Sequence, residues 1–122
     1  MKIDESSVTP IFMQIAAWVK EEIQKGNLKE EEQIPSTNQF ASAYRINPAT
    51  VGKGFNLLVE EGILYKKRGI GMFVKAGAHE KLKDAARQTF LEETLKKFLL
   101  EADGLGITRQ ELIVMIEEQE DN

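Results

Sequence analysis

The residues best suited to chemistry lie in one stretch, residues 34–74, which reads IPSTNQFASAYRINPATVGKGFNLLVEEGILYKKRGIGMFV. Its hydroxyl, amide and ammonium groups can hydrogen-bond phosphate oxygens and base edges, and its alanine methyl can touch a thymine methyl. The stretch therefore predicts contacts with double-stranded DNA. The expected DNA-binding residues are Ser36, Thr37, Asn38, Asn47, Ala49, Thr50, Lys53, Asn56, Lys66, Lys67, Arg68 and Gly69.

Two helices must position these groups. Ser36, with Gln39 three residues later, forms a capping box that begins a helix of about two turns, ending near Ala43. Asn47 followed by Pro48 begins a second helix, which buries Val51, Phe55 and Leu58 and ends at Gly62. Two helices joined by a tight turn are typical of a helix-turn-helix, whose second helix enters the major groove.

Two glycines interrupt the second helix, and each costs about 1 kcal/mol relative to alanine. We expect Gly52 to face DNA and Gly54 to face the core. A two-stranded ribbon follows, with strands near residues 63–65 and 72–74. Its tip, residues 66–71, contains two glycines and three cations, which suit phosphate or a narrow minor groove.

Helical patterns flank this stretch on both sides. Thr9 is the expected N-cap of a first helix with Pro10 at its first position, and apolar residues then recur every four residues up to Ile23. A long helix is expected over residues 79–102, and a capping box at Thr108 and Glu111 begins another. The chain divides into residues 1–76 and residues 77–122, a mainly α fold with one small β-hairpin.

The C-terminal helices carry more apolar surface than they can bury alone. Docking on the N-terminal domain and dimerisation could each cover it, and we favour dimerisation because the first domain can close its own core. The expected dimer interface comprises Phe90, Leu91, Leu95, Phe98, Leu99, Leu112, Ile113 and Ile116.

The net charge of −4, taken alone, argues against a nucleic-acid partner. Residues 1–78, however, contain ten Lys/Arg and nine Asp/Glu, whereas residues 79–122 contain six and eleven. Residues 45–78 alone contain six basic and two acidic residues. The positive charge therefore coincides with the expected helix-turn-helix and ribbon.

Other classes of function find little support. The chain contains no cysteine and a single histidine, His79, so neither a catalytic residue, a metal site nor a cofactor is expected. Adjacent carboxylates such as Glu92 and Glu93 diverge on a helix. The N-terminus lacks the apolar segment of a signal peptide, and no apolar run is long enough to cross a membrane, so we expect a cytoplasmic protein.

Residues 8–76 resemble the winged-helix domain of the GntR family of bacterial transcription regulators. The resemblance lies in Ile34-Pro35-Ser36, in Thr50-Val51, and in a wing that includes EEGIL and GIGMFV. The short two-helix tail is similar to the YtrA-type subfamily, which implies a homodimer and control of neighbouring transporter genes. We expect no pocket comparable to the large effector domain of other relatives in a tail this short. A small ligand bound at the dimer interface remains an alternative.

The chain departs from the family pattern at three positions. Asn38, Pro48 and Gly52 stand where relatives often carry arginines, so the usual arginine–base contacts do not transfer. Ser36, Thr50 and Gly69 match the pattern. We expect a DNA-binding transcription regulator, a repressor, that acts as a homodimer on a near-palindromic operator. The alternative is a winged-helix module for protein–protein interaction that does not bind DNA.

Overall fold

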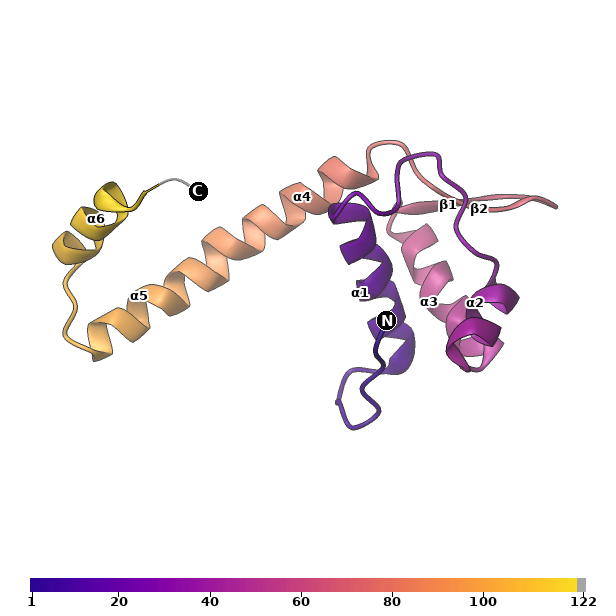
Figure 1. Ribbon diagram of the computed structural model, residues 1–122, viewed down its shortest axis with the longest axis horizontal. Helices are drawn as coiled ribbons and strands as arrows, with labels where there is room; N and C mark the ends of the chain where they lie inside the picture. Colours follow the sequence, from indigo (N-terminus) through magenta and orange to yellow (C-terminus); the bar gives the residue numbers. More distant parts are fainter. Residues whose placement is uncertain (121–122) are drawn as a thin grey trace. The chain divides into compact units, whose positions relative to one another are not determined.

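A computed structural model describes residues 1–120 and divides the chain into two compact units, of which the first is Met1–Lys83 and the second begins at Asp84. The first unit contains α1 (Ile11–Gln24), α2 (Thr37–Tyr44), α3 (Pro48–Glu60), β1 (Leu64–Lys67), β2 (Gly71–Val74) and the start of α4 (Ala78–Thr89) (Figure 1). The second contains the rest of α4, the π-helical segment η1 (Phe90–Thr94), α5 (Leu95–Gly104) and α6 (Arg109–Glu118). The expected class, mainly helical with one β-hairpin, is confirmed.

Side-chain caps fix where the two helices of the motif begin. The Ser36 hydroxyl accepts a hydrogen bond from the Gln39 backbone N–H at 3.1 Å, and the Gln39 side chain accepts one from the Ser36 N–H at 2.9 Å. At α3, the Asn47 side chain accepts a hydrogen bond from the Ala49 N–H at 2.8 Å. These local contacts satisfy N–H groups that have no partner within the helix, so both expected starts are confirmed.

The start of α1 differs from the expectation. Pro10, rather than Thr9, is the N-cap residue, and no side chain caps the helix. Pro10 has a non-helical ψ of 149°, which moves the start of the helix one residue along the chain. The Gln14 side chain folds back and donates hydrogen bonds to the carbonyls of Thr9 and Asp4, at 2.9 and 2.8 Å. These bonds hold the N-terminal segment against the first turn of α1, and the helix begins at Ile11.

The core of the first unit forms where α1 packs on α3, with α2 and the hairpin closing its sides. An aromatic cluster joins three helices: the Phe40 ring lies 5.6 Å from Trp18 and 5.4 Å from Phe55 between centroids. Residues with less than 5% of their surface exposed include Ile15, Val19, Ile23, Ile34, Phe40, Val51, Phe55, Leu58, Ile63, Leu64 and Val74. The unit extends beyond the expected boundary at residue 76, because Ala78 and Leu82 of α4 belong to the same core.

Gly54 lets α1 and α3 approach closely. A Cβ atom there would lie 2.7 Å from the Phe12 carbonyl oxygen, which is backbone and cannot move aside easily. Gly52, by contrast, would place a Cβ no nearer than 3.8 Å to a Thr37 methyl group. The structure confirms that Gly54 faces the core, and it leaves room at Gly52.

We therefore expect Gly54→Ala to destabilise the fold by about 1–3 kcal/mol, because the added methyl group overpacks the α1–α3 contact. Gly52→Ala is the matched control and should stabilise the fold by about 0.5–1 kcal/mol, as alanine does in a helix interior. Urea denaturation followed by circular dichroism measures both free energies. Equal stabilisation by the two substitutions would contradict the packing argument.

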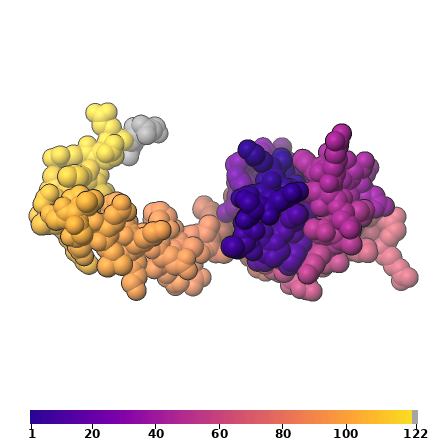
Figure 2. Space-filling model, turned by 90° about the horizontal axis from the view of Figure 1, so that it is seen from below, coloured from indigo at the N-terminus to yellow at the C-terminus, as the bar shows by residue number. Residues whose placement is uncertain are grey.

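The hairpin pairs β1 with β2 antiparallel, with Leu64 opposite Val74 and Lys67 opposite Gly71. Residues 67–70 form its turn, closed by a hydrogen bond of 3.0 Å from the Ile70 N–H to the Lys67 carbonyl. Gly69 occupies the third position with φ +78°, a conformation that glycine adopts without strain. The tip protrudes from the first unit (Figure 2). Both strands are longer than the expected 63–65 and 72–74, so more of the basic segment is paired.

The described part of the second unit consists of helices, with a short turn over residues 105–108 between α5 and α6; residues 121 and 122 of the expected C-terminal domain lie outside the described part. The expected long helix over residues 79–102 is interrupted by η1, where the Leu95 N–H donates to the Phe90 carbonyl five residues earlier. At α6, Thr108 and Glu111 form the predicted capping box. The helices of this unit leave much apolar side-chain surface exposed.

Candidate nucleic-acid interface

The outward face of α3 is the first component of the interface. Because α3 buries Val51, Gly54, Phe55 and Leu58, its opposite side is presented away from the core. Ala49, Gly52, Lys53 and Asn56 line an open hollow along that side, together with Phe12, Leu57 and Glu60. A helix with its core on one side and small, amide and ammonium groups on the other can lie in a major groove and hydrogen-bond base edges.

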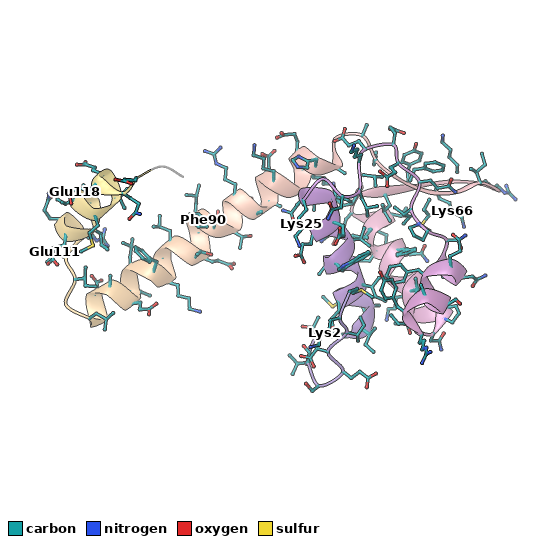
Figure 3. The ribbon with its side chains drawn as sticks, in the orientation of Figure 1. Lys2, Lys25, Lys66, Phe90, Glu111 and Glu118 are labelled. Carbon is teal, nitrogen blue, oxygen red and sulfur yellow. The ribbon has the colours of Figure 1, made fainter. Side chains whose placement is uncertain are left out.

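The start of α2 and the wing form the second component. One open hollow is lined by Ser36, Thr37 and Asn38 together with Lys66, which is distant from them in the sequence. Figure 3 shows Lys66 on the hairpin, on the side toward α2. The N–H groups of a helix start and an ammonium on the same hollow attract a phosphate. The structure thus brings four of the predicted residues together.

Lys67 lies on the opposite face of the hairpin from Lys66, because successive residues of a strand alternate. Its ammonium is 4.6 Å from the centre of the Phe73 ring and 5.9 Å from that of Tyr65. The Tyr65 hydroxyl donates a hydrogen bond to the Glu31 carboxylate, and this bond raises the pKa of Tyr65 above its usual range. Lys67 is therefore separated from the α2 hollow, whereas Arg68 lies exposed in the turn.

The electrostatics of this face favour an anion. Residues 33–59 contain no Asp or Glu, and neither do residues 62–78. The two carboxylates between them lie at the end of α3, and the Glu61 carboxylate pairs with Lys20 at 2.8 Å. The acidic residues of the second unit lie outside both segments. The cations of α3 and the wing thus lie in chain segments without carboxylates, and the acidic groups near them are Glu60, in the α3 hollow, and Glu31, which binds Tyr65 on the Lys67 face of the hairpin.

Three residues that the sequence interpretation did not select also contribute. Phe12 places its ring 4.1 Å from the Lys53 ammonium. Gln33 donates a hydrogen bond to the Ile70 carbonyl at 3.1 Å and so braces the wing. Arg45 is exposed in the turn between α2 and α3, in a left-handed conformation with φ +54°. Of these three residues, only Arg45 could have been selected from the sequence, as a cation in the turn. The roles of Phe12 and Gln33 depend on contacts with residues distant in sequence.

The predicted interface residues of the second unit are exposed or half-buried. Phe90 is 57%, Phe98 48% and Ile116 69% exposed, whereas Leu99 and Leu112 are half-buried. Leu112 and Ile116 of α6 line a hollow with Phe98 of α5. Figure 2 shows the atoms of α6 against the C-terminal end of α5. Leu100, Leu105, Val114 and Met115 are also exposed, so the apolar surface is larger than predicted.

Comparison with known proteins decides the family. The model of the bacterial regulatory proteins of the gntR family matches residues 13–74, the segment that holds α2, α3 and the wing. The HTH-type transcriptional repressor YtrA of Bacillus subtilis is 33% identical over 118 residues, which cover 97% of this chain and 90% of YtrA. The chain belongs to the GntR family.

Solved structures of similar proteins agree with this fold. A putative GntR-family transcriptional regulator from Bacteroides thetaiotaomicron has a TM-score of 0.71 and 33% identity, covering 88% of this chain and 94% of that one. The AraR(DBD) structure in complex with operator ORX1 has a TM-score of 0.55 and 25% identity, covering 61% of this chain and 92% of that one. This GntR protein is a DNA-binding transcription regulator and not an enzyme, and the expected similarity to YtrA is confirmed.

Proposed function

We propose that this GntR protein is a transcription repressor that binds a near-palindromic operator as a homodimer. The observation that supports it most strongly is the first unit's surface of α3, the start of α2 and the wing. We call this surface the DNA-facing surface. It carries hydrogen-bonding groups and cations on rigid, capped elements. YtrA and several other relatives are named as transcriptional repressors.

On the DNA-facing surface, each component has a separate task. Ala49, Thr50, Lys53 and Asn56 of α3 read the major groove, and Asn47 caps α3. Ser36, Thr37, Asn38 and Lys66 bind phosphate, while Arg68 and Gly69 at the wing tip approach the minor groove. With no arginine at Pro48 or Gly52, we infer that base readout depends on Lys53, the wing and DNA shape.

Dimerisation rests on the exposed apolar surface of the second unit. Five successive residues of α6, Leu112 to Ile116, are apolar, so apolar groups lie all around this part of the helix. One side faces the hollow with Phe98, and Ile113 and Val114 remain exposed elsewhere on the helix. A helix that is apolar all round is normally buried. A second copy of the same unit supplies the matching apolar cover.

The π-helical segment makes the apolar face continuous. In a regular α-helix, residues five apart are separated by about 140° around the axis. The hydrogen bond from the Leu95 N–H to the Phe90 carbonyl widens this turn, which reduces that angle and brings Phe90 closer to the side of the helix that carries Leu95. Phe90 lies midway along the helical run (Figure 3). We infer that η1 aligns Phe90 with Leu95 and Phe98 in one dimer-forming face.

Because such a repressor acts on chromosomal DNA, we infer that this protein acts in the cytoplasm. Among the described residues, no helix is both long and apolar enough to span a membrane. By its similarity to the YtrA type, we infer that transporter genes next to its own are the regulated targets. Selection of bound fragments from genomic DNA tests this assignment, and a site beside unrelated genes only would contradict it.

Specific binding should weaken steeply with salt, because each neutralised phosphate releases a counterion. Two protomers that each neutralise about three or four phosphates would lose on the order of 10³-fold in affinity between 50 and 200 mM salt. Fluorescence anisotropy with a duplex selected by the protein from randomised DNA measures the slope, and a scrambled duplex is the control. Affinity that stays flat would contradict the phosphate contacts, and no binding to any duplex would favour a protein-interaction module.

A further inference from the structure

The Lys53 ammonium rests on an aromatic ring from a different helix. It lies 4.1 Å from the centre of the Phe12 ring, which belongs to the first turn of α1. Lys53 is exposed on the outward face of α3, Phe12 is half-buried, and both line the same hollow. We propose that Phe12 is a positioning residue for DNA recognition: its ring holds the Lys53 ammonium over the outward face of α3 before DNA binds.

The backbone around Phe12 makes this ring a fixed support. The Phe12 carbonyl lies so close to α3 that a Cβ on Gly54 would come within 2.7 Å of it. Ile15, one turn further along α1, is fully buried against the same position of α3. The start of α1 therefore cannot shift away from α3 without disturbing the core. The backbone that carries the Phe12 ring is thus held at a fixed position relative to the backbone of Lys53.

An aromatic ring suits this task better than a carboxylate. Lysine carries its charge on a flexible stem, and ordering that stem on binding lowers affinity. A ring face attracts the ammonium without neutralising its charge or occupying its N–H donors in hydrogen bonds. Glu60 lines the same hollow about two helical turns away, and an ion pair with it would reduce the charge offered to DNA. Phe12 orders Lys53 and leaves its charge available to phosphate or guanine.

The inference rests on the proposed function in one respect, the assignment of the outward face of α3 to DNA. A double-mutant cycle separates failure of this inference from failure of the proposed function. The full-length protein and its Phe12→Leu, Lys53→Met and Phe12→Leu/Lys53→Met variants are titrated with the duplex that the unmodified protein selects from randomised DNA. Phe12→Tyr, which keeps the ring, is the matched control for Phe12→Leu.

We expect Phe12→Leu to weaken specific binding about two- to fivefold, the range of an exposed cation–π contact. Lys53→Met should weaken binding more and reduce the salt slope by about 2, one for each protomer of the dimer, whereas Phe12→Leu should leave the slope unchanged. In the Lys53→Met background, Phe12→Leu should have no further effect, because the group it positions is gone. Phe12→Tyr should bind like the unmodified protein.

Equal effects of Phe12→Leu in both backgrounds would overturn the proposal, since Phe12 would then act through folding or through its own DNA contact. Nuclear magnetic resonance of the free protein gives a second readout. The Lys53 protons next to the ammonium should show a ring-current shift that Phe12→Leu removes and Phe12→Tyr keeps, and absence of that shift would also overturn the proposal. If the unmodified protein binds no duplex, the proposed function fails. The ring-current measurement needs no DNA, so it still tests the contact between Lys53 and Phe12 in that case.

Discussion

Replacing Lys66 and Arg68 by alanine is expected to weaken specific DNA binding on the order of 10- to 100-fold, because the substitutions remove a charge-assisted phosphate contact of Lys66 and a minor-groove contact of Arg68. The salt slope should fall by about 4 at the same time, because a homodimer loses both cations in each of its two half-sites. Lys66 shares its hollow with the start of α2, and Arg68 lies exposed in the turn of the hairpin. Both side chains leave the domain core untouched, so the melting temperature should stay constant.

Lys67→Ala is the matched control for that experiment. Lys67 has the same charge and the same hairpin, but its ammonium lies over the Phe73 ring on the opposite face. We expect it to reduce affinity less than about threefold, by weakening the long-range field alone. Gel-shift titrations of both variants decide the matter. A Lys67→Ala effect as large as that of the double variant would show that the two faces of the hairpin are not distinguished, and unchanged binding by both would remove the wing from the mechanism.

Introducing a carboxylate into the exposed apolar face of α5 is expected to give monomers. Leu95→Glu or Phe98→Glu would bury an unpaired charge in the proposed interface, and such burial costs several kcal/mol, or more than about 100-fold in the dimerisation constant. Both positions are exposed in a single chain, at 40% and 48%. The second unit therefore has no reason to unfold when they change. Light scattering combined with gel filtration measures the mass directly.

Lys97→Glu provides the control, because it adds the same side chain on the other side of α5. Its mass should remain that of a dimer. The two apolar variants should also lose affinity for a two-half-site operator while keeping their weaker affinity for a single half-site, since the first unit is intact. Dimers that persist in both Leu95→Glu and Phe98→Glu would place the interface elsewhere.

Local features of the sequence predicted the elements well, since caps and turns depend on neighbouring residues. Ser36 with Gln39, Asn47 with Pro48, and Thr108 with Glu111 each bond to groups within three residues, and all three caps occur as expected. The apolar stripe of α3 followed from helical periodicity alone. Thr9 is not the cap because Pro10 keeps a non-helical ψ of 149°, so the helix begins one residue later than the local pattern predicted.

Contacts between distant segments needed the tertiary structure. The run KKR read as one basic tip, but strand alternation in the paired hairpin separates Lys66 from Lys67. Helical periodicity predicted one long helix, and the π turn at Phe90 shifts the apolar face within it. Neither the separation of Lys66 from Lys67 nor the π turn can be read from composition or charge.

The sequence by itself predicted the family, the order of the helices and the wing, and the buried faces of α1 and α3, because these follow from caps, periodicity and family motifs. Only the tertiary structure decided which side chains share a surface. It joined Ser36 to Lys66, and Phe12 to Lys53, across long stretches of chain. The physical reason is that a helix start is fixed by bonds between neighbours, whereas a binding surface is fixed by how packed elements meet.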